Sequence, residues 1–93
     1  MFHININRTH NLTFDRSREV VETLVSQLTE RYECHARWQD GSLYFERSGI
    51  AGQIDFEPGM VRISARLGFL LVPLKHRLEQ EIHRYLDEGF GES

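Results

Sequence analysis

Three turn sequences divide residues 34–67 into four short segments of alternating polarity, and this pattern constrains the fold more than any other feature. The turns are Asp40-Gly41, Ser48-Gly49 and Glu57-Pro58-Gly59, all built from residue types that favour tight reversals. Alternation with period two places successive side chains on opposite faces of a strand. The segments therefore predict a four-stranded antiparallel meander. The residues predicted to face its core are Cys34, Ala36, Trp38, Leu43, Phe45, Ile50, Gly52, Ile54, Phe56, Val61, Ile63, Ala65 and Leu67.

One more strand and a helix precede the meander, and a second helix follows it. The sequence FHININ near the N-terminus also alternates and predicts a half-buried strand. Residues 14–32 change to helical spacing, and either Thr13 or Asp15 can cap this helix. We expect Gly89 and Gly91 to end the last helix. The predicted core stripes are Val21, Leu24, Val25, Leu28 and Tyr32 in the first helix, and Leu71, Leu74, Leu78, Ile82 and Tyr85 in the second, with Leu86 at its margin.

The element order β-α-β-β-β-β-α predicts a single α+β domain over residues 1–93. Each strand has one apolar face and each helix has one apolar stripe, so both helices should pack on the same face of a five-stranded sheet. The result is a two-layer sandwich with a mostly antiparallel sheet, in which the position of the first strand stays open. The other face of the sheet would be exposed to solvent or covered by a second copy.

The uncharged stretch LGFLLVPL, residues 67–74, is predicted to contain three short pieces. Leu67 completes a strand, and Gly68 makes the corner. Pro73 lacks an N–H, so it belongs in the first turn of the last helix, which should start near residues 70–72.

Three side chains of this stretch, Phe69, Leu70 and Val72, do not lie on the core stripe. Burial of large apolar side chains contributes about 1.5–3 kcal/mol each, so something should cover them. One interpretation is that they pack beneath the loop after the first strand or against the first helix. The other is that they form a contact surface for a second chain or an apolar particle.

Composition and charge exclude several classes of protein. A chain of 93 residues with 40% hydrophobic residues can form one modest core. The net charge of −3 gives no electrostatic reason to expect nucleic acid as a partner. Cys34 is the single cysteine, there is no signal-peptide pattern, and no apolar run approaches the roughly 20 residues that span a bilayer. These features predict a soluble, cytoplasmic protein without a membrane span.

No catalytic, metal-binding or cofactor-binding set is visible in the sequence. His76 and His83 lie two helical turns apart, roughly 10 Å, which is too far for one metal ion. His3 and His35 could be neighbours only if their strands were adjacent. Cys34 alternates inward and is predicted to be a small buried thiol. This favours a non-enzymatic protein over an enzyme, although folding could still bring reactive residues together.

The outward face of the sheet is the second candidate binding surface. Its residues are Arg37, Tyr44, Arg62 and Arg66, together with His3, His35 and Gln53. Basic and aromatic groups on an open sheet are typical of platforms for single-stranded nucleic acid. However, Glu46 and Asp55 share this face, so a solvated surface with cross-strand charge pairs is the favoured interpretation.

An ordered set of short motifs runs through nearly the whole chain: INR-H-L, then RW-D--L-F-RSG--G-I, then V-ISARLGFLL, then EIHRYLDE-F. In this set the chain resembles a small bacterial family, the polyhydroxyalkanoic acid system proteins, from Ile4 to Phe90. Gln80 stands where an acidic residue would be expected. The matching positions include Arg8, His10, Leu12, Trp38, Phe45, Gly49, Gly52, Leu67, Gly68 and Leu71.

The resemblance implies a setting, the genes and granules of polyhydroxyalkanoate storage polyester, and carries no catalytic residues. The first hypothesis is a non-enzymatic accessory protein that binds the granule surface or a granule protein through Phe69, Leu70 and Val72. The alternative is a binding domain whose open sheet face takes an anionic ligand or forms a homodimer. A weaker alternative is an enzyme that acts on a hydroxyacyl substrate.

Overall fold

The computed structural model describes residues 2–90 and confirms the predicted element order. The strands are β1 (Phe2–Thr9), β2 (His35–Gln39), β3 (Ser42–Arg47), β4 (Ile50–Glu57) and β5 (Met60–Leu67). The helices are α1 (Phe14–Tyr32), a six-residue 3-10 helix η1 (Phe69–Leu74), and α2 (Lys75–Phe90). The protein therefore has the predicted α+β fold.

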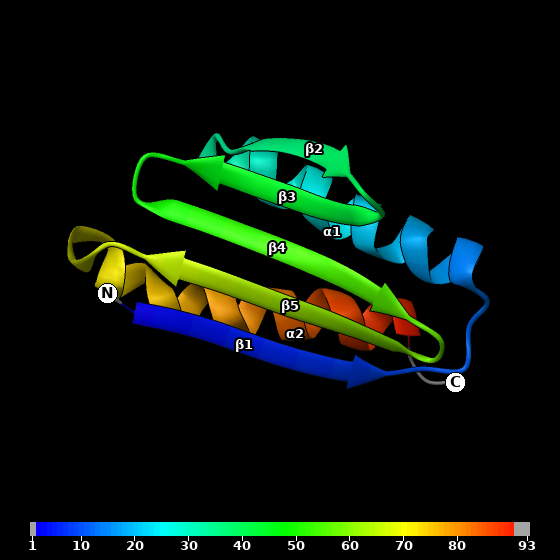
Figure 1. Ribbon diagram of the computed structural model, residues 1–93. Helices are drawn as coiled ribbons and strands as arrows, with labels where there is room; N and C mark the ends of the chain where they lie inside the picture. Colours follow the sequence, from blue (N-terminus) through cyan, green and yellow to red (C-terminus); the bar gives the residue numbers. More distant parts are fainter. Residues whose placement is uncertain (1, 91–93) are drawn as a thin grey trace.

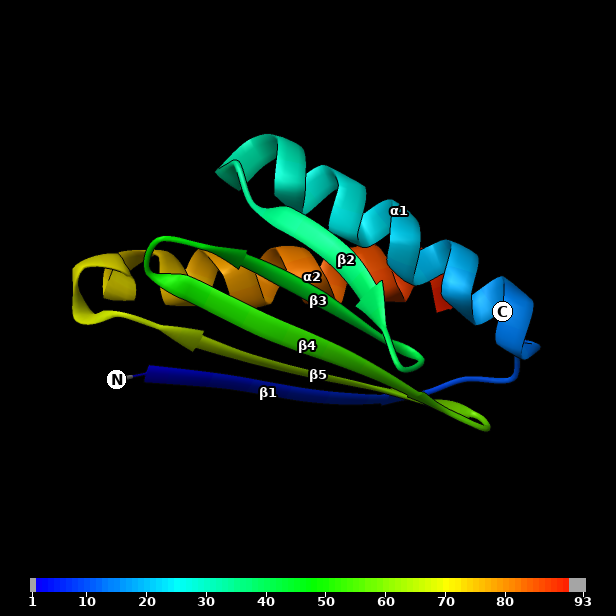
Figure 2. The ribbon, with the colours of Figure 1, turned by 45° about the horizontal axis from the view of Figure 1, so that its top comes forward.

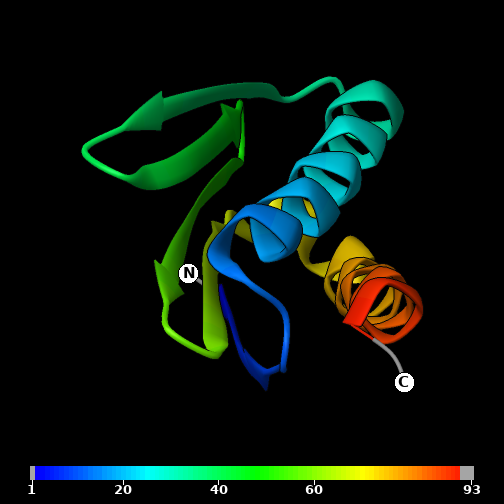
Figure 3. The ribbon, with the colours of Figure 1, turned by 90° about the vertical axis from the view of Figure 1, so that its right-hand side faces the viewer.

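The five strands form one antiparallel sheet in the order β1-β5-β4-β3-β2 (Figure 1). The open question of the first strand is thereby settled: β1 lies at an edge and pairs with β5, with Ile4 opposite Ala65 and Ile6 opposite Ile63. Both helices lie on one face of the sheet, and no helix of residues 2–90 lies on the other face (Figures 2 and 3).

The core fills the space between the sheet and the two helices, as the alternation predicts. Fully buried side chains come from every layer, with Ile4, Ile54 and Leu67 from the sheet, Leu24 from α1 and Leu86 from α2. Leu86 was predicted at the margin of the stripe, but it is buried, whereas Tyr85 is only partly buried. The α2 stripe is therefore rotated slightly from its expected position.

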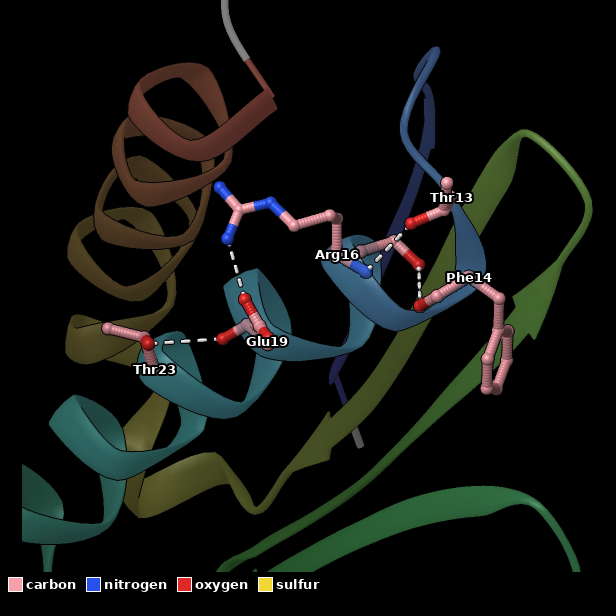
Figure 4. Close-up of polar contacts among 6 residues, drawn as sticks. Thr13, Phe14, Arg16, Glu19 and Thr23 are labelled. Carbon is pink, nitrogen blue, oxygen red and sulfur yellow. Dashed lines mark hydrogen bonds and ion pairs between the residues drawn. The ribbon is translucent and has the colours of Figure 1, made fainter.

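Side-chain caps and ion pairs define how α1 starts and how the two helices meet. Thr13 is the N-cap: its Oγ1 accepts a hydrogen bond from the backbone N–H of Arg16 at 3.2 Å (Figure 4). At the other end of α1, Arg31 forms an ion pair with Glu81 of α2. The Tyr32 hydroxyl donates a hydrogen bond to the same carboxylate at 3.2 Å. Burial of this ring raises the pKa of Tyr32, which keeps the hydroxyl protonated as a donor.

Three local predictions are wrong, each for a physical reason. The last helix does not start near residues 70–72, because η1 comes first and α2 begins at Lys75, so Pro73 lies within η1. Gly89 lies inside α2 and does not cap it. A glycine is needed here because Val20 of α1 packs against it: a Cβ added to residue 89 would lie 2.3 Å from Val20 Cγ1. Gly91 lies outside the described residues. The third wrong prediction is the burial of β2: all five of its residues are exposed, although Trp38 does lie on the side of the sheet that carries the helices.

Candidate functional site

The strand-to-helix corner presents two large apolar side chains at one end of the molecule. Phe69 is 74% exposed and Leu70 is 80% exposed, the two most exposed large apolar side chains among residues 2–90. The interpretation in which they pack within their own chain is therefore wrong for both. Val72 is half-buried, so it contributes less to this surface.

Hydrogen bonds and the partly buried Leu71 hold η1 in place beneath this exposed pair. The N–H of Gly68 donates to the carbonyl of Gly49 in the β3–β4 turn, and the N–H of Leu71 donates to the carbonyl of Gly68, both at 2.9 Å. The Leu71 side chain packs against the core and occupies the space that a side chain on Gly49 would need. The corner therefore has a defined shape, with Leu71 directed inward and Phe69 and Leu70 directed outward.

Phe2 adds a third apolar side chain at the same end of the sheet. It lies opposite Leu67 in the β1–β5 pair and is 41% exposed. The start of β1 and η1 lie at the same end of the molecule (Figure 1). We call Phe2, Phe69 and Leu70 the apolar tip. Sequence reasoning missed Phe2, whose only signal is its place at the start of an edge strand, where the cover of the helices ends.

The open sheet face does not gather its four predicted residues into one cluster. Arg66 and Tyr44 line a shallow hollow of ≈ 360 Å³ together with His3, Glu46 and Gln53. Arg37 lies outside the hollow and stacks its guanidinium 5.2 Å from the centre of the Tyr44 ring.

Arg62 is engaged elsewhere on this face. Its Nη2 lies 3.2 Å from Glu57 Oε2. Asp55, opposite Arg62 in the register, instead accepts hydrogen bonds from Ser42 at 2.5 Å and Gln53 at 2.8 Å. One solvated cross-strand charge pair, Arg62–Glu57, is thus present, but it does not use Glu46 or Asp55. The hollow around Arg66 offers space for a ligand on this face.

An aromatic cluster lies near the N-terminal half of α1, where alternation predicted the correct face for Trp38 and Phe56 but not how much of Trp38 stays exposed. Trp38 of β2 is 36% exposed and stacks on Phe56 at 5.5 Å, and Phe14 meets Phe56 edge-on at 5.8 Å. The Phe14 ring extends from the first turn of α1 toward the sheet (Figure 4). Arg18 lies over the Trp38 ring at 4.4 Å, and the indole N–H donates to Glu22. These contacts attach the edge strand β2 to α1.

The histidines and the cysteine form no reactive set among residues 2–90. His3 and His35 lie on opposite edges of the sheet, so they are not neighbours. His83 Nδ1 lies 3.1 Å from Arg8. No group of three metal-ligating side chains occurs in this part of the chain. Cys34 is buried as predicted, and burial raises the pKa of its thiol, which favours the protonated form.

His10 is a structural residue in the turn between β1 and α1. Its ring stacks on Phe90 at 4.7 Å, and its Nδ1 accepts a hydrogen bond from the N–H of Leu12 at 3.0 Å. Burial lowers the pKa of His10, so the neutral ring is favoured at this position. The turn is fixed further by the N–H of His10, which donates to the carbonyl of Gly59.

Comparison with known proteins identifies a family and nothing more detailed. A search of curated proteins and a search of solved structures gave no match. No helix within residues 2–90 is long and apolar enough to cross a bilayer. The model of the family described as "Putative polyhydroxyalkanoic acid system protein" matches residues 4–90, nearly the whole chain. The chain therefore belongs to the polyhydroxyalkanoic acid system family.

Proposed function

We propose that this protein is a non-enzymatic accessory protein of polyhydroxyalkanoate metabolism that acts in the cytoplasm by attaching to the storage granule. The observation that carries the proposal is the apolar tip, in which Phe69 and Leu70 are three-quarters exposed on an ordered corner. A polyester surface offers alkyl chains and ester groups without charge. Adsorption would remove the two side chains from water and contribute up to about 1.5–3 kcal/mol for each.

The direct test is the double variant Phe69→Ser, Leu70→Ser in a granule co-sedimentation assay. The substituted side chains lie outside the core, so we expect the unfolding midpoint to stay close to that of the parent. A smaller fraction of the double variant should pellet, corresponding to an affinity for granules at least about tenfold weaker than that of the parent. A loss of about 1.4 kcal/mol of binding free energy is enough for this effect. Phe14→Ser is the matched control, since Phe14 is also exposed but does not belong to the apolar tip.

Two kinds of particle distinguish binding to the polyester itself from binding to a granule protein. Protein-free polyhydroxybutyrate particles report contact with the polymer, and native granules also report contact with granule proteins. Parent protein that pellets only with native granules points to a granule protein as the partner. A double variant that pellets like the parent with both particles would contradict the proposal.

A second function is supported by the hollow on the open sheet face. Arg66, His3 and Tyr44 offer a cation, an imidazole and a hydroxyl around the same space, which suits a small carboxylate or phosphate. Glu46 in the same hollow opposes such a ligand, and this ranks the hollow below the apolar tip. Self-association through this face is the other use that its exposure allows.

Charge reversal tests the hollow. Arg66→Glu should abolish the NMR shift changes that 3-hydroxybutyrate or inorganic phosphate induces at Tyr44 and Gln53. Arg62→Glu is the control, because Arg62 lies on the same face but pairs with Glu57 outside the hollow. Parent protein whose spectrum does not respond to either anion would rule out this function.

A further inference from the structure

The outer edge of β1 is a long strand edge without the usual protection. β1 has eight residues, and β5 is its only pairing partner within residues 2–90 (Figure 1). Natural proteins protect such edges with Lys or Pro residues, bulges or very short strands, since unpaired N–H and C=O groups invite another strand. β1 contains no Lys or Pro. The opposite edge strand, β2, is only five residues long and carries Arg37.

The one charged residue of β1 does not protect the edge either. The Arg8 side chain is only 24% exposed and lies beside α2, with Nη1 2.8 Å from Asp87 Oδ1 and Nη2 3.1 Å from His83 Nδ1. From Phe2 to Asn7 the strand contains no Lys, Arg, Asp or Glu. A strand that approached this edge would therefore meet no Lys, Arg, Asp or Glu of β1 over six residues.

The hydrogen-bond pattern shows which backbone groups are available. The N–H of His10 donates to the carbonyl of Gly59, directly opposite in the continued β1–β5 register. Bonded pairs alternate along an antiparallel ladder, so the even-numbered residues of β1 bond to β5. A second bond gives the same result independently. The N–H of Gly68 donates to the carbonyl of Gly49 in the continued β4–β5 register, so the even-numbered residues of β5 bond to β4 and its odd-numbered residues bond to β1. The N–H and C=O groups of the odd-numbered residues His3, Asn5, Asn7 and Thr9 therefore point to the free edge.

We propose that this edge pairs with β1 of a second copy, antiparallel across a two-fold axis, and joins the two sheets into one. A register centred on Asn5 places Asn5 opposite Asn5 of the second copy and His3 opposite Asn7. This pairing forms about six backbone hydrogen bonds. On the open face of the sheet β1 is complementary to itself in this arrangement, because Asn5 then lies beside Asn5 and His3 beside Asn7, all polar side chains.

The apolar face of β1 supports the same partner. With Asn5 on the axis, Ile4 lies beside Ile6 of the second copy, and Phe2 lies beside the aliphatic part of Arg8. The apolar inner layer of one sheet then continues into the other without a like-charge contact. Both helical layers lie on the same side of the joined sheet, and the two apolar tips lie toward its opposite ends.

Two substitutions at Asn5 test the pairing on the full-length chain by sedimentation equilibrium. Asn5→Pro removes an N–H that points to the free edge, so the monomer loses no bond to β5 while the intermolecular ladder is broken. Asn5→Lys places two like charges at the axis. The parent should have twice the mass of one chain at high concentration, and both variants should have the mass of one chain with an unchanged unfolding cooperativity.

Ala36→Pro is the matched control on the opposite edge. The same alternation, continued across the sheet, points the N–H of Ala36 away from β3, and this residue is exposed. Ala36→Pro should remain dimeric. A monomeric parent would overturn the proposal, as would Asn5 variants that stay dimeric. Dissociation by Ala36→Pro alone, or by Arg66→Glu alone, would assign the contact to β2 or to the open sheet face and overturn it equally.

Discussion

Gly52→Ala is expected to lower the free energy of unfolding by about 2–3 kcal/mol, as an overpacked core position does. Gly52 lies directly opposite Phe45, and an added Cβ would lie 2.1 Å from Cζ of that ring. The ring is almost fully buried over the glycine, so it cannot move aside without leaving the core. Alanine is slightly better suited to a strand than glycine, but that gain is well below the steric cost.

Gly68→Ala provides the matched control for this substitution. Gly68 has φ −68° and ψ 159°, a conformation open to alanine, and an added Cβ would meet Gly49 Cα at 3.8 Å, an ordinary contact. Chemical denaturation of the two variants should show a shift for Gly52→Ala and almost none for Gly68→Ala. Equal midpoints would show that the Phe45 ring has more freedom than its burial implies.

Gly49→Ala is expected to destabilise the protein by two separable effects. Gly49 has φ +89°, where a side chain costs about 1–2 kcal/mol. In addition, an added Cβ would lie 2.7 Å from Leu71 Cδ1, so the Leu71 side chain would have to leave its position against the core. Displacement of Leu71 from its site adds a further loss, on the order of 1–2 kcal/mol.

Gly41→Ala separates the two effects. Gly41 has a similar φ of +82°, also lies in a tight turn, and an added Cβ would meet no atom within 4 Å. The difference in unfolding free energy between the two alanine variants therefore measures the contact with Leu71. Proteolysis after Phe69 or Leu70 should become faster in Gly49→Ala only. Equal stability and equal cleavage in both variants would show that Leu71 does not anchor the corner.

The sequence was sufficient for the order of the elements because turns and alternation are local signals. The three Gly-containing turns and the inward positions from Leu43 to Leu67 lie where the pattern predicts. The pairing of β1 with β5 depends on contacts between distant segments, and no local pattern encodes it. The exposure of Trp38 was not predictable for a related reason. Two helices, each about 10 Å across, barely cover five strands spaced about 4.8 Å apart, and alternation alone cannot show which edge stays uncovered.

The candidate site was predicted in part. Helical spacing correctly separated Leu71 and Leu74 from Phe69 and Leu70, since the first pair packs against the core and the second does not. Whether another part of the chain would bury Phe69 and Leu70 depended on how neighbouring segments pack, which the sequence does not specify. The 3-10 geometry of η1 rests on the bond from Leu71 to Gly68, a three-residue spacing that the apolar pattern could not distinguish from an α-helical start.

The attachment of η1 to the β3–β4 turn has a consequence for the affinity of the proposed binding by the apolar tip. A flexible loop of this length would lose about 1–2 kcal/mol of conformational entropy for each residue that becomes fixed on a surface. In this protein, folding has already fixed the six residues of η1. A corner preorganised in this way retains most of the free energy that Phe69 and Leu70 gain when they leave water. The proposed attachment would therefore need fewer apolar side chains than a mobile segment would require.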